Sequence, residues 1–458
     1  MFGMKLYSEN ENYKLYQGNM LDMLEVIESN SIDSIVTDPP YELNFMGKGW
    51  DNAGVSFQKE TWQKCYEVLK PGGYLLAFGG SRTFHRIACA IEDAGFEIRD
   101  TIMWLYGSGF PKSMNIGLAI DKKNGVESKV VGKGKSGNTS KAFNDYQYRI
   151  DEGIYSTSGN YEIKEAQNEW QGWGTALKPS FEPIIVARKP FKGSLVDNVI
   201  EYGVGGINID ECRVVCNDKV KMNIRDTSSC SDGWNRPWME DKEKDRLRQE
   251  IAIEKANNLG RFPANTILTY DETDFDEVCG GFPNTKSQKT NSKLLDIRGN
   301  NYNNANKNLD VAYERGYTDS GSASRYFYCA KASKKDRDEG LDTFNQEKVN
   351  DGRKTPIDNA SQRGETLRKN THPTVKPTEL MQYLVRLVSP NGATILDPFN
   401  GSGSTGKAVM YENKERNKNY KYIGIELTEE YLPITKARIE YVCNLKEEQT
   451  SLDLSDLD

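Results

Sequence analysis

Short apolar runs alternate with helix-like segments over residues 14–110. Each run ends in a polar or glycine-rich turn, and the segments between the runs carry apolar residues every three or four positions. Strands separated by helices of this length indicate a parallel sheet with helices on its faces. The predicted strands are 34–37, 74–78 and 98–105, and the predicted helices are 62–69 and 84–94.

The same alternation returns near the C-terminus, and one further strand is predicted at 184–187. The expected fold class is therefore α/β, with one doubly wound, mostly parallel sheet domain assembled from both ends of the chain. The C-terminal predicted helices are 380–387, 406–411 and 428–441, and the predicted strands there are 394–396 and 422–425.

The middle of the chain has a different composition. Residues 286–310 include seven Asn, which is unfavourable for dense packing. Residues 241–254 mix charges at helical spacing, which is typical of a solvated helix face. We therefore expect a polar insertion between the two parts of the sheet domain.

The net charge of the whole chain argues against a nucleic-acid partner, but the charges of individual segments favour one. The 458 residues carry 60 Lys plus Arg against 67 Asp plus Glu, a net charge of −7. Residues 1–110 carry 9 basic against 15 acidic residues, whereas 112–149 carry 8 against 3 and 286–376 carry 18 against 12. The basic middle segments restore nucleic acid as a candidate partner.

Several classes of protein are excluded or disfavoured. No apolar run approaches the roughly 18–20 residues that span a bilayer, and the first ten residues lack a secretory signal pattern. The eight Cys are scattered, so we expect reduced thiols and a cytoplasmic protein. Cys212 and Cys216 are spaced like half of a zinc site, but the chain has two His and no second pair, so no metal is expected.

The first candidate site is Asp38-Pro39-Pro40-Tyr41, directly after the predicted strand 34–37. In open parallel sheets, ligands bind beyond the carboxyl ends of the strands. Proline fixes φ and has no N–H, so carbonyls near the two Pro can point outward as acceptors. A carboxylate and a carbonyl can hold both hydrogens of an amino group, and Tyr41 can stack on a flat ring. Asp-Pro alone is ordinary turn chemistry, but all four residues after an apolar strand favour a functional site.

The second candidate site is the run Asp397 to Gly406, which joins a predicted strand to a predicted helix. Its glycines let a ligand approach the backbone and the helix N-terminus. Gly401 to Lys407 also satisfies the phosphate-loop pattern G-x-x-x-x-G-K, but Ala408 stands where that loop needs Ser or Thr for Mg²⁺. A P-loop nucleotide triphosphatase is therefore a minor alternative, beside a glycine-lined turn that only packs. Glu426, at the end of the next strand, can accept ribose hydroxyls.

Together these residues resemble the amino-group DNA methyltransferases that use S-adenosylmethionine. Asp38 to Tyr41 is similar to their catalytic motif, and His372 to Pro377 to the segment that closes over the methionine end of the cofactor. The catalytic motif comes first along the chain, which is the order of the permuted β class. Segments 173–179, 182–184 and 325–331 resemble parts of bacterial and phage members. The run similar to the cofactor motif is Asp397-Pro398-Phe399-Asn400-Gly401-Ser402-Gly403.

The resemblance implies a seven-stranded, mostly parallel methyltransferase sheet with a reversed last strand and an inserted target-recognition region. The implied domains are 1–190, the catalytic half; 191–365, the recognition region; 366–445, the cofactor-binding half; and 446–458, an acidic tail.

S-adenosylmethionine is the implied cofactor. Its adenosine ring would lie near Phe399, its ribose on Glu426 and its methionine side along Thr374 and Lys376. The family often has Gly-Asp in contact with the adenine region, where this chain has Gly18-Asn19. Asn19, or Asp22 nearby, is therefore expected to replace that contact.

The implied reaction is methyl transfer to an exocyclic amine of a base in duplex DNA. The Asp38 carboxylate and the Pro39 carbonyl would accept the amine hydrogens and direct the nitrogen lone pair toward the methyl group. The target nucleotide must be flipped out of the duplex, and Tyr41 would stack on it. Asp in this motif favours adenine N6, because N4-cytosine members usually have Ser. An N4-cytosine enzyme, a methyltransferase of structured RNA and a silent DNA-binding protein stay open as alternatives.

Double-stranded DNA is the expected partner, and no membrane association is expected. The resemblance also implies a homodimer and a cognate restriction endonuclease as candidate partners. The expected reader of DNA is 191–365, where aromatic residues interleave with Arg and Lys, a mixture that suits phosphate contacts and stacking. These aromatic residues include Trp234, Trp238, Tyr302, Tyr326 and Tyr328.

Overall fold

The structure is a computed structural model of the 458-residue chain. The acidic tail 446–458 and the aromatic residues Trp234, Trp238, Tyr302 and Tyr326 lie outside the described residues. The described residues are 5–43, 54–106, 113–135, 160–214, 220–222, 242–270, 284–286, 315–317, 320–322, 327–331, 334–348 and 367–445.

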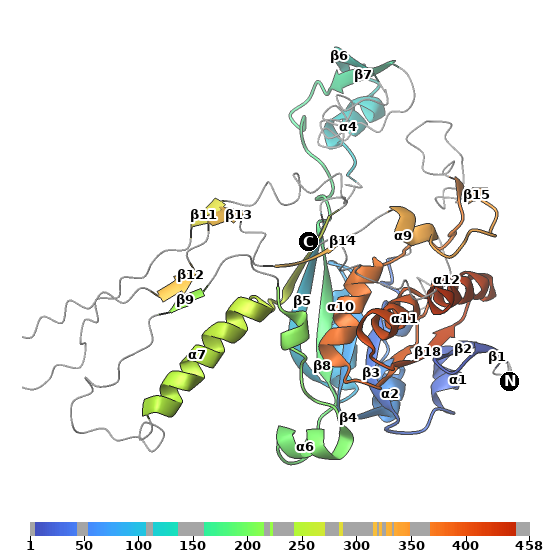
Figure 1. The fold of residues 1–458 in the computed structure, drawn as a ribbon. Coiled ribbons are helices and arrows are strands. Elements are labelled where there is room, and N and C mark those ends of the chain that lie inside the picture. The colour runs from blue at the N-terminus through green and yellow to red at the C-terminus, as the bar shows by residue number, and fades with distance from the viewer. Residues whose placement is uncertain are drawn as a thin grey trace, which may run out of the picture.

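One large sheet runs through the centre of the molecule (Figure 1). It has ten strands in the spatial order β1-β2-β18-β17-β3-β4-β8-β5-β10-β14. Six of the nine neighbouring pairs are parallel, and β8 runs antiparallel to both β4 and β5. The expected mostly parallel α/β sheet is confirmed. The strands are β1 (Lys5–Glu9), β2 (Tyr13–Gln17), β3 (Ile32–Thr37), β4 (Leu69–Phe78), β5 (Glu97–Tyr106), β8 (Phe181–Arg188), β10 (Thr266–Tyr270), β14 (Tyr328–Lys331), β17 (Thr394–Asp397) and β18 (Lys421–Glu426).

The expectation of seven strands is wrong, because the sheet is extended at both edges. At one edge β1 pairs antiparallel with β2. At the other edge β10 and β14 continue the sheet parallel to β5. Both strands come from the part of the chain expected to form the insertion, and Ile267 and Leu268 of β10 are fully buried. A sequence pattern does not reveal this edge, because the choice of pairing partner is a tertiary property.

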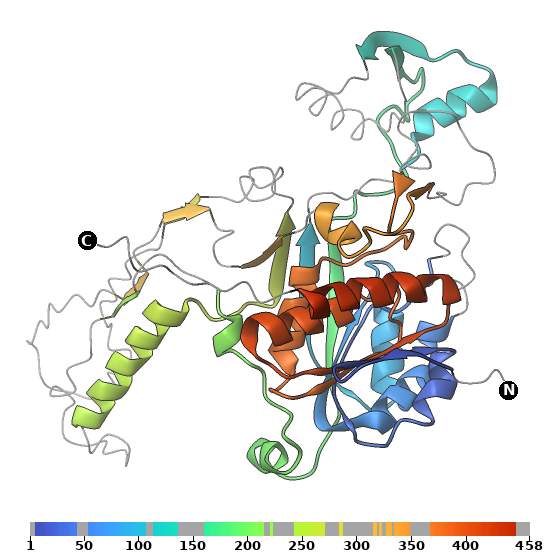
Figure 2. The same ribbon diagram turned by 45° about the vertical axis from the view of Figure 1, so that its right-hand side comes forward.

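Helices cover both faces of the sheet (Figures 1 and 2). Trp62 and Ile87 pack in the apolar cluster on one face, and Leu380 and Ile439 pack in the cluster on the other. One face carries α1 (Met20–Leu24), α2 (Lys59–Val68) and α3 (Phe84–Asp93), and the other carries α10 (Thr378–Val388), α11 (Ser404–Arg416) and α12 (Leu432–Asn444).

The central strands are apolar on both sides because they are covered on both sides. Successive side chains of a strand point to opposite faces, so Ile35 of β3 joins one cluster and Val36 joins the other. All six residues of β3 are buried, including the polar Asp33, Ser34 and Thr37, as expected of a parallel strand that is covered on both faces. The side chains that face a ligand therefore come from beyond the strand ends.

The remaining described elements lie around this domain. In Figures 1 and 2, α4 with the β6–β7 hairpin stands apart at the top and α7 projects to one side. Within the described residues, no helix combines the length and the apolar character needed to cross a lipid bilayer. These elements are α4 (Ile116–Asn124), β6 (Lys129–Lys135), β7 (Asn160–Glu165), α6 (Leu195–Tyr202), α7 (Lys242–Leu259) and α9 (Lys334–Asp338), with the paired strands β9 (Val220–Met222) and β12 (Arg315–Tyr317), β11 (Asn284–Lys286) and β13 (Ser320–Ser322), and β15 (Glu347–Lys348) and β16 (Leu367–Arg368).

Tyr328 is the one aromatic residue of the expected DNA-reading group that the structure describes. Its ring stacks on Tyr383 of α10, with centroids 4.1 Å apart and planes 17° apart. It packs against the buried cluster of this face of the sheet. Tyr328 is therefore partly buried against the sheet domain, and its expected contact with DNA stays a prediction.

Candidate active site

Both sequence motifs lie at the carboxyl edge of the sheet, on neighbouring strands. β3 and β17 are parallel, with Ser34 opposite Ile395 and Ile35 opposite Leu396. Asp38 therefore follows one strand, and Asp397 ends the next. β18, on the other side of β17, adds Glu426 to the same edge. A cavity of about 1110 Å³ lies over this edge.

The cavity brings together residues from distant parts of the sequence. Of the predicted site residues, Gly403 lies outside its lining and instead caps the start of α11, with a φ of 74°. A further wall is formed by 175–182, which includes Glu182. The predicted residues in the lining are Asn19, Asp38, Pro39, Pro40, Tyr41, Thr374, Lys376, Asp397, Pro398, Phe399, Asn400, Gly401, Ser402 and Glu426.

Four polar residues, Asp38, Tyr41, Glu182 and Lys376, form a charged group that we call the Asp38 cluster. Lys376 Nζ lies 2.7 Å from Asp38 Oδ2 and 3.4 Å from Glu182 Oε2. The Tyr41 hydroxyl has one hydrogen and two carboxylate acceptors within reach, Asp38 Oδ1 at 2.9 Å and Glu182 Oε2 at 2.7 Å. Burial and the two neighbouring carboxylates hold the pKa of Tyr41 well above its ordinary value, so its hydroxyl stays a donor.

Lys376 keeps its positive charge although it is buried. Burial lowers the pKa of the ammonium group, but the Asp38 and Glu182 charges raise it more, so the pKa lies above its ordinary value. The ammonium also lies 5.0 Å from the centroid of the Phe78 ring and 5.8 Å from that of Trp104. Aromatic faces at this distance attract a cation. The cluster therefore joins one ammonium group to two carboxyl groups.

The loop after β3 is held by hydrogen bonds to its backbone. Ser56 Oγ donates to the Pro40 carbonyl at 2.7 Å, and Thr83 Oγ1 donates to the Tyr41 carbonyl at 2.9 Å. The two prolines restrict φ within the same loop. These contacts fix the position of the Asp38 carboxylate over the strand end.

Asp397 supports the glycine loop from within the protein. Its carboxylate accepts hydrogen bonds from Thr37 Oγ1 at 2.7 Å, from Thr405 Oγ1 at 2.6 Å and from the Phe399 N–H at 3.1 Å. Burial outweighs these bonds and raises the pKa of the Asp397 carboxyl to about 6. One of its contacts comes from the end of β3, so Asp397 links the two motifs directly.

Glu426 closes the opposite side of the glycine loop. Its Oε2 accepts from the Gly401 N–H at 2.7 Å, and its Oε1 accepts from the Thr428 N–H at 2.7 Å. The side chain is buried, and burial raises its pKa to about 7. Each carboxylate oxygen has a second lone pair, so Glu426 keeps acceptor positions for hydroxyl donors from a ligand in the cavity.

Gly401 is required by both its conformation and its surroundings. Its φ is +53°, and a Cβ at this position would lie 2.9 Å from His372 Nε2. His372 Nδ1 contacts the Thr374 carbonyl oxygen at 2.8 Å. Burial lowers the pKa of His372 to about 3, so its ring is neutral at physiological pH. The segment around His372 therefore packs on the glycine loop and carries Lys376 to the Asp38 cluster.

Asn19 and Phe399 line the cavity but also have structural roles. Asn19 Oδ1 accepts from the Leu21 N–H at 3.0 Å and caps the short helix α1. The Phe399 ring packs on Trp62, with centroids 6.4 Å apart. Their place in the lining agrees with the expected cofactor side, and their internal contacts explain why these residue types stand there.

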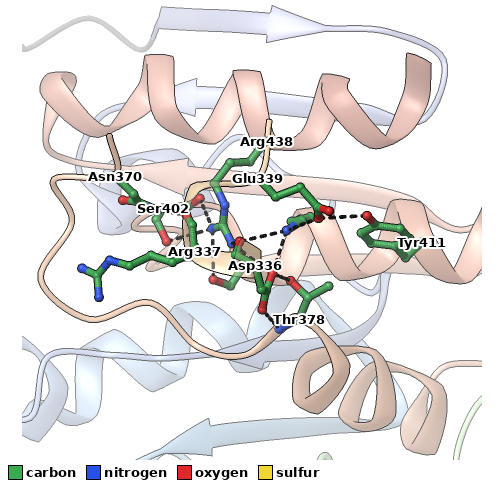
Figure 3. Close-up of polar contacts among 10 residues, drawn as sticks. Asp336, Arg337, Glu339, Asn370, Thr378, Ser402, Tyr411 and Arg438 are labelled. Carbon is green, nitrogen blue, oxygen red and sulfur yellow. Dashed lines mark hydrogen bonds and ion pairs between the residues drawn. The ribbon is translucent and has the colours of Figure 1, made fainter. Parts of the chain in front are cut away.

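Lys407, the lysine of the phosphate-loop pattern, points away from the cavity. Its side chain is 0% exposed and lies 2.7 Å from both Asp336 Oδ1 and Glu339 Oε2. Arg438, also 0% exposed, lies 3.9 Å from Asp336 Oδ1 and donates to the Ser402 carbonyl at 2.8 Å. We call Asp336, Glu339, Lys407 and Arg438 the Asp336 cluster; Figure 3 labels Asp336, Glu339 and Arg438 of this cluster together with the Tyr411 and Thr378 side chains. This internal pairing argues against the P-loop alternative.

The sequence pattern assigns no role to Glu182, which is part of the Asp38 cluster. The sequence feature that could have pointed to Glu182 is a carboxylate at the start of the strand Phe181–Arg188, in which most other residues are apolar. Within the described residues, no group of three or more His, Cys, Asp or Glu is arranged to hold a metal ion. Cys212 is buried, and Cys216 lies outside the described residues.

The fold and the site define an α/β protein with a ligand cavity at the carboxyl edge of its sheet. A family model described as DNA methylase (N6_N4_Mtase) matches residues 32–437. That range is most of the chain, so the protein belongs to the N6/N4 family of DNA methylases.

Individual relatives match parts of the chain. The type II methyltransferase M.HindIII of Haemophilus influenzae is 24% identical over 42% of this chain and 64% of its own length, so the chain spans less than two thirds of it. M2.LlaDCHI of Lactococcus lactis subsp. cremoris is 32% identical over 44% of this chain and 82% of its own length. Among solved structures, the PvuII DNA methyltransferase (cytosine-N4-specific) covers 99% of this chain and 94% of its own, with 12% identity and a TM-score of 0.38.

Proposed function

We propose that the protein transfers a methyl group from S-adenosylmethionine to the exocyclic N6 amine of adenine in duplex DNA. The observation that carries this proposal is that the Asp38 loop and the glycine loop at Gly401 follow neighbouring strands and line one cavity. Membership of a DNA methylase family supports DNA as the substrate. When bound, S-adenosylmethionine supplies a methyl group on a positively charged sulfur, and the sulfur keeps the bonding electrons as a thioether.

The glycine-loop side of the cavity fits this cofactor. Gly401 lines the cavity, and the Glu426 carboxylate beside it has acceptor positions for two ribose hydroxyls. Phe399 offers an apolar wall for the adenosine ring, with Asn19 beside it. Thr374 lines the same cavity and is assigned to the methionine side.

The Asp38 side of the cavity fits an exocyclic amine. The lone pair of such an amine is delocalised into the ring, which makes the nitrogen a weak nucleophile. Hydrogen bonds from its two hydrogens to the Asp38 carboxylate and the Pro39 carbonyl direct the lone pair out of the ring plane. As the new C–N bond forms, the nitrogen gains positive charge, and Asp38 stabilises this charge until a proton leaves. Tyr41 lines the same space and stacks on the base.

Three further assignments belong to this proposal. Asp at the head of the motif favours adenine over cytosine. The order of the motifs is that of the permuted β class, with 1–190 and 366–445 as the two parts of one catalytic domain. Residues 191–365, apart from the sheet strands β10 and β14, read the DNA. The target base is flipped out of the duplex into the cavity. A homodimer and a cognate restriction endonuclease are candidate partners that only the family resemblance predicts.

The experiment that tests this function measures transfer of labelled methyl groups to duplex DNA of mixed sequence. Digestion of the product and mass spectrometry distinguish N6-methyladenine from N4-methylcytosine. We expect N6-methyladenine from the wild-type protein and a loss of roughly 100-fold or more in Asp38→Asn, because the charged acceptor of the amine is removed.

Asp93→Asn is the matched control, because Asp93 is an exposed aspartate at the end of α3. It is expected to keep the wild-type rate. Wild-type activity retained in Asp38→Asn would refute the role of Asp38, and N4-methylcytosine as the product would refute the choice of base.

A further inference from the structure

Glu182 reaches the Asp38 cluster because its strand runs against its neighbours. β3 and β4 are parallel, so both end at the edge where Asp38 lies. β8 is antiparallel to β4 and β5, so this edge receives the beginning of β8 rather than its end. Glu182 is the second residue of β8 and lies opposite Trp104 of β5. The reversed strand thus supplies a second carboxylate at the strand ends that carry the first motif.

Both oxygens of the Asp38 carboxylate have partners in this state of the protein. Oδ1 accepts from the Tyr41 hydroxyl at 2.9 Å, and Oδ2 lies 2.7 Å from Lys376 Nζ. Each oxygen has a second lone pair, but an oxygen shared between two donors binds each of them less strongly, so a target amine that donates to Asp38 weakens its contact with Tyr41 or with Lys376. The amine can bind Asp38 well only if the displaced donor has another acceptor, because an unpaired buried donor or charge is costly.

Glu182 provides that acceptor for both donors. Its Oε2 already lies 2.7 Å from the Tyr41 hydroxyl and 3.4 Å from Lys376 Nζ. The contact to Lys376 is 0.7 Å longer than the contact from Lys376 to Asp38, so a small movement of the ammonium exchanges the two. The Tyr106 hydroxyl lies 3.4 Å from Glu182 Oε1, on the other side of the carboxylate.

The surroundings of Lys376 allow this exchange without loss of its charge. Its ammonium lies among three aromatic rings, with centroids 5.0 Å away for Phe78, 5.3 Å for Tyr41 and 5.8 Å for Trp104. Contacts of a cation with ring faces tolerate small displacements, unlike a single directed hydrogen bond. The Glu182 side chain is 20% exposed and that of Asp38 is 21% exposed, so the two acceptors are alike in solvation.

We propose that Glu182 is a positioning residue for methyl transfer, which takes over Lys376 and Tyr41 when the target amine binds Asp38. This proposal rests on the proposed function of the Asp38 cluster. In the resting cluster Lys376 orients and neutralises Asp38. With the amine bound, Glu182 holds the ammonium and the hydroxyl, and the Asp38 carboxylate is left for the substrate. Glu182 thus acts through Lys376 and Tyr41 and not on the reacting atoms.

The test is a double-mutant cycle on methyl transfer to duplex DNA with Glu182→Gln, Lys376→Met and the double variant. Glu182→Gln keeps the shape of the side chain but removes its charge. We expect kcat to fall roughly tenfold or more, because a charged hydrogen-bond partner is lost during turnover. KM for the cofactor is expected to change less than about twofold, since Glu426 and the glycine loop are untouched. In the Lys376→Met background, Glu182→Gln is expected to lower kcat less than about threefold further.

Two outcomes would overturn the proposal. One is a Glu182→Gln variant with wild-type kcat, and the other is two substitutions whose effects simply multiply. A merely structural role would also change cofactor KM and the melting temperature, which are measured in parallel. If Glu182→Gln does not fold, Glu182→Asp carries the test, because it keeps the charge but withdraws the carboxylate by one methylene. The proposal then expects kcat lowered roughly threefold or more, and an unchanged kcat refutes it.

Glu97→Gln is the matched control. Glu97 pairs with Arg188 at 2.7 Å at the opposite end of the β5–β8 ladder, so the same kind of charge is removed from the same pair of strands. It is expected to leave kcat unchanged. Failure of the proposed function is recognised separately, because the wild-type protein would then transfer no methyl group to DNA. Wild-type activity with a silent Glu182→Gln refutes only the role of Glu182.

Discussion

Two lysines of this protein are each held between two carboxylates, and they differ in what can reach them. Lys376 pairs with Asp38 and Glu182, whose side chains are 21% and 20% exposed and line the cavity. Lys407 is 0% exposed and pairs at 2.7 Å with both Asp336 and Glu339, whose side chains are 18% exposed but lie outside the lining of the cavity. A ligand in the cavity therefore meets the Asp38 cluster, whereas the Asp336 cluster lies away from it.

The difference teaches that the same set of charges serves two purposes, depending on access. In the Asp336 cluster the partners are fixed. Burial acts to raise the pKa of Asp336, but the charge of Lys407 and hydrogen bonds from Lys407 and Thr378 outweigh it and hold the pKa below its ordinary value. In the Asp38 cluster the Lys376 ammonium has two carboxylate acceptors at unequal distances. A bound ligand can take the place of the ammonium on one of these carboxylates. Ion pairs whose partners are fixed help to specify the structure. An ion pair in which a ligand can replace one partner is suited to catalysis.

The largest effect is expected when Lys407 is replaced. Lys407→Met removes the fully buried ammonium that pairs with two partly buried carboxylates and leaves Arg438 as the remaining cation of the cluster. We expect this to lower the free energy of unfolding by about 3 kcal/mol. Urea unfolding followed by circular dichroism measures this change. Lys376→Met is the matched comparison, and because its carboxylates can be hydrated from the cavity it is expected to cost about 1 kcal/mol or less. Equal losses in the two variants would contradict the distinction between a closed and an open cluster.

Glu426 is a buried carboxylate that has no lysine partner within the described residues, and it extends the comparison of the two clusters. Within the described residues no cation pairs with Glu426, and burial raises its pKa from 4.5 to about 7. Because the folded state holds this proton more tightly than the unfolded state, the contribution of Glu426 to stability is complete below pH 4.5. It is lost as the pH rises through 7. We expect a loss of about 3 kcal/mol from this group between pH 4.5 and pH 8.

The measurement is the free energy of unfolding of the wild-type protein and of Glu426→Gln across this pH range. The Glu426→Gln variant has no carboxyl proton to lose at this position. Its free energy of unfolding is therefore expected to fall by about 3 kcal/mol less than that of the wild-type protein between pH 4.5 and pH 8. Asp397, whose pKa burial raises to about 6, contributes with the same sign to both proteins and cancels in the difference. Parallel curves for the two proteins would refute the assignment.

The smallest effect is expected from Glu339→Gln, the counterpart of Glu182→Gln in the closed cluster. Lys407 keeps its pair with Asp336, and the amide oxygen of Gln can still accept from the Tyr411 hydroxyl, which lies 2.9 Å from Glu339 Oε2. We expect a loss of about 1 kcal/mol in stability and methyl transfer within about twofold of wild type. A large loss of kcat with little loss of stability would show that the Asp336 cluster takes part in turnover.

Much of the site could be predicted from local sequence, because its residues are contiguous. Asp38 to Tyr41 and Asp397 to Ser402 follow apolar strands, and the carboxyl ends of parallel strands meet at one edge of the sheet. By sequence, Lys376 is expected on the cofactor side and Lys407 is connected only with the minor P-loop alternative, and the structure has Lys376 and not Lys407 in the lining of the cavity. The ion pairs of Lys376 with Asp38 and Glu182 could not be predicted, because they depend on how distant segments pack.

The features that local sequence could not predict depend on long-range pairing. The added strands β10 and β14 lie in the sheet because they pair beside β5, which no local pattern specifies. Glu182 is part of the site because β8 is reversed between its neighbours. The helix at the end of the chain begins at Leu432 and not at Thr428, because Glu429–Tyr431 forms a 3₁₀ turn first.

The hydrogen bond from Thr37 to Asp397 joins residues 360 positions apart. During synthesis from the N-terminus, β3 is made early, but its neighbour β17 follows only after more than three hundred further residues. Until then the centre of the sheet has an open edge, which is a site for wrong pairing. Contacts of such sequence separation also form slowly, because a long loop must close first. Folding of the central sheet therefore has to wait for β17 and β18, and a fragment cut before them would leave the edges of β2 and β3 unpaired.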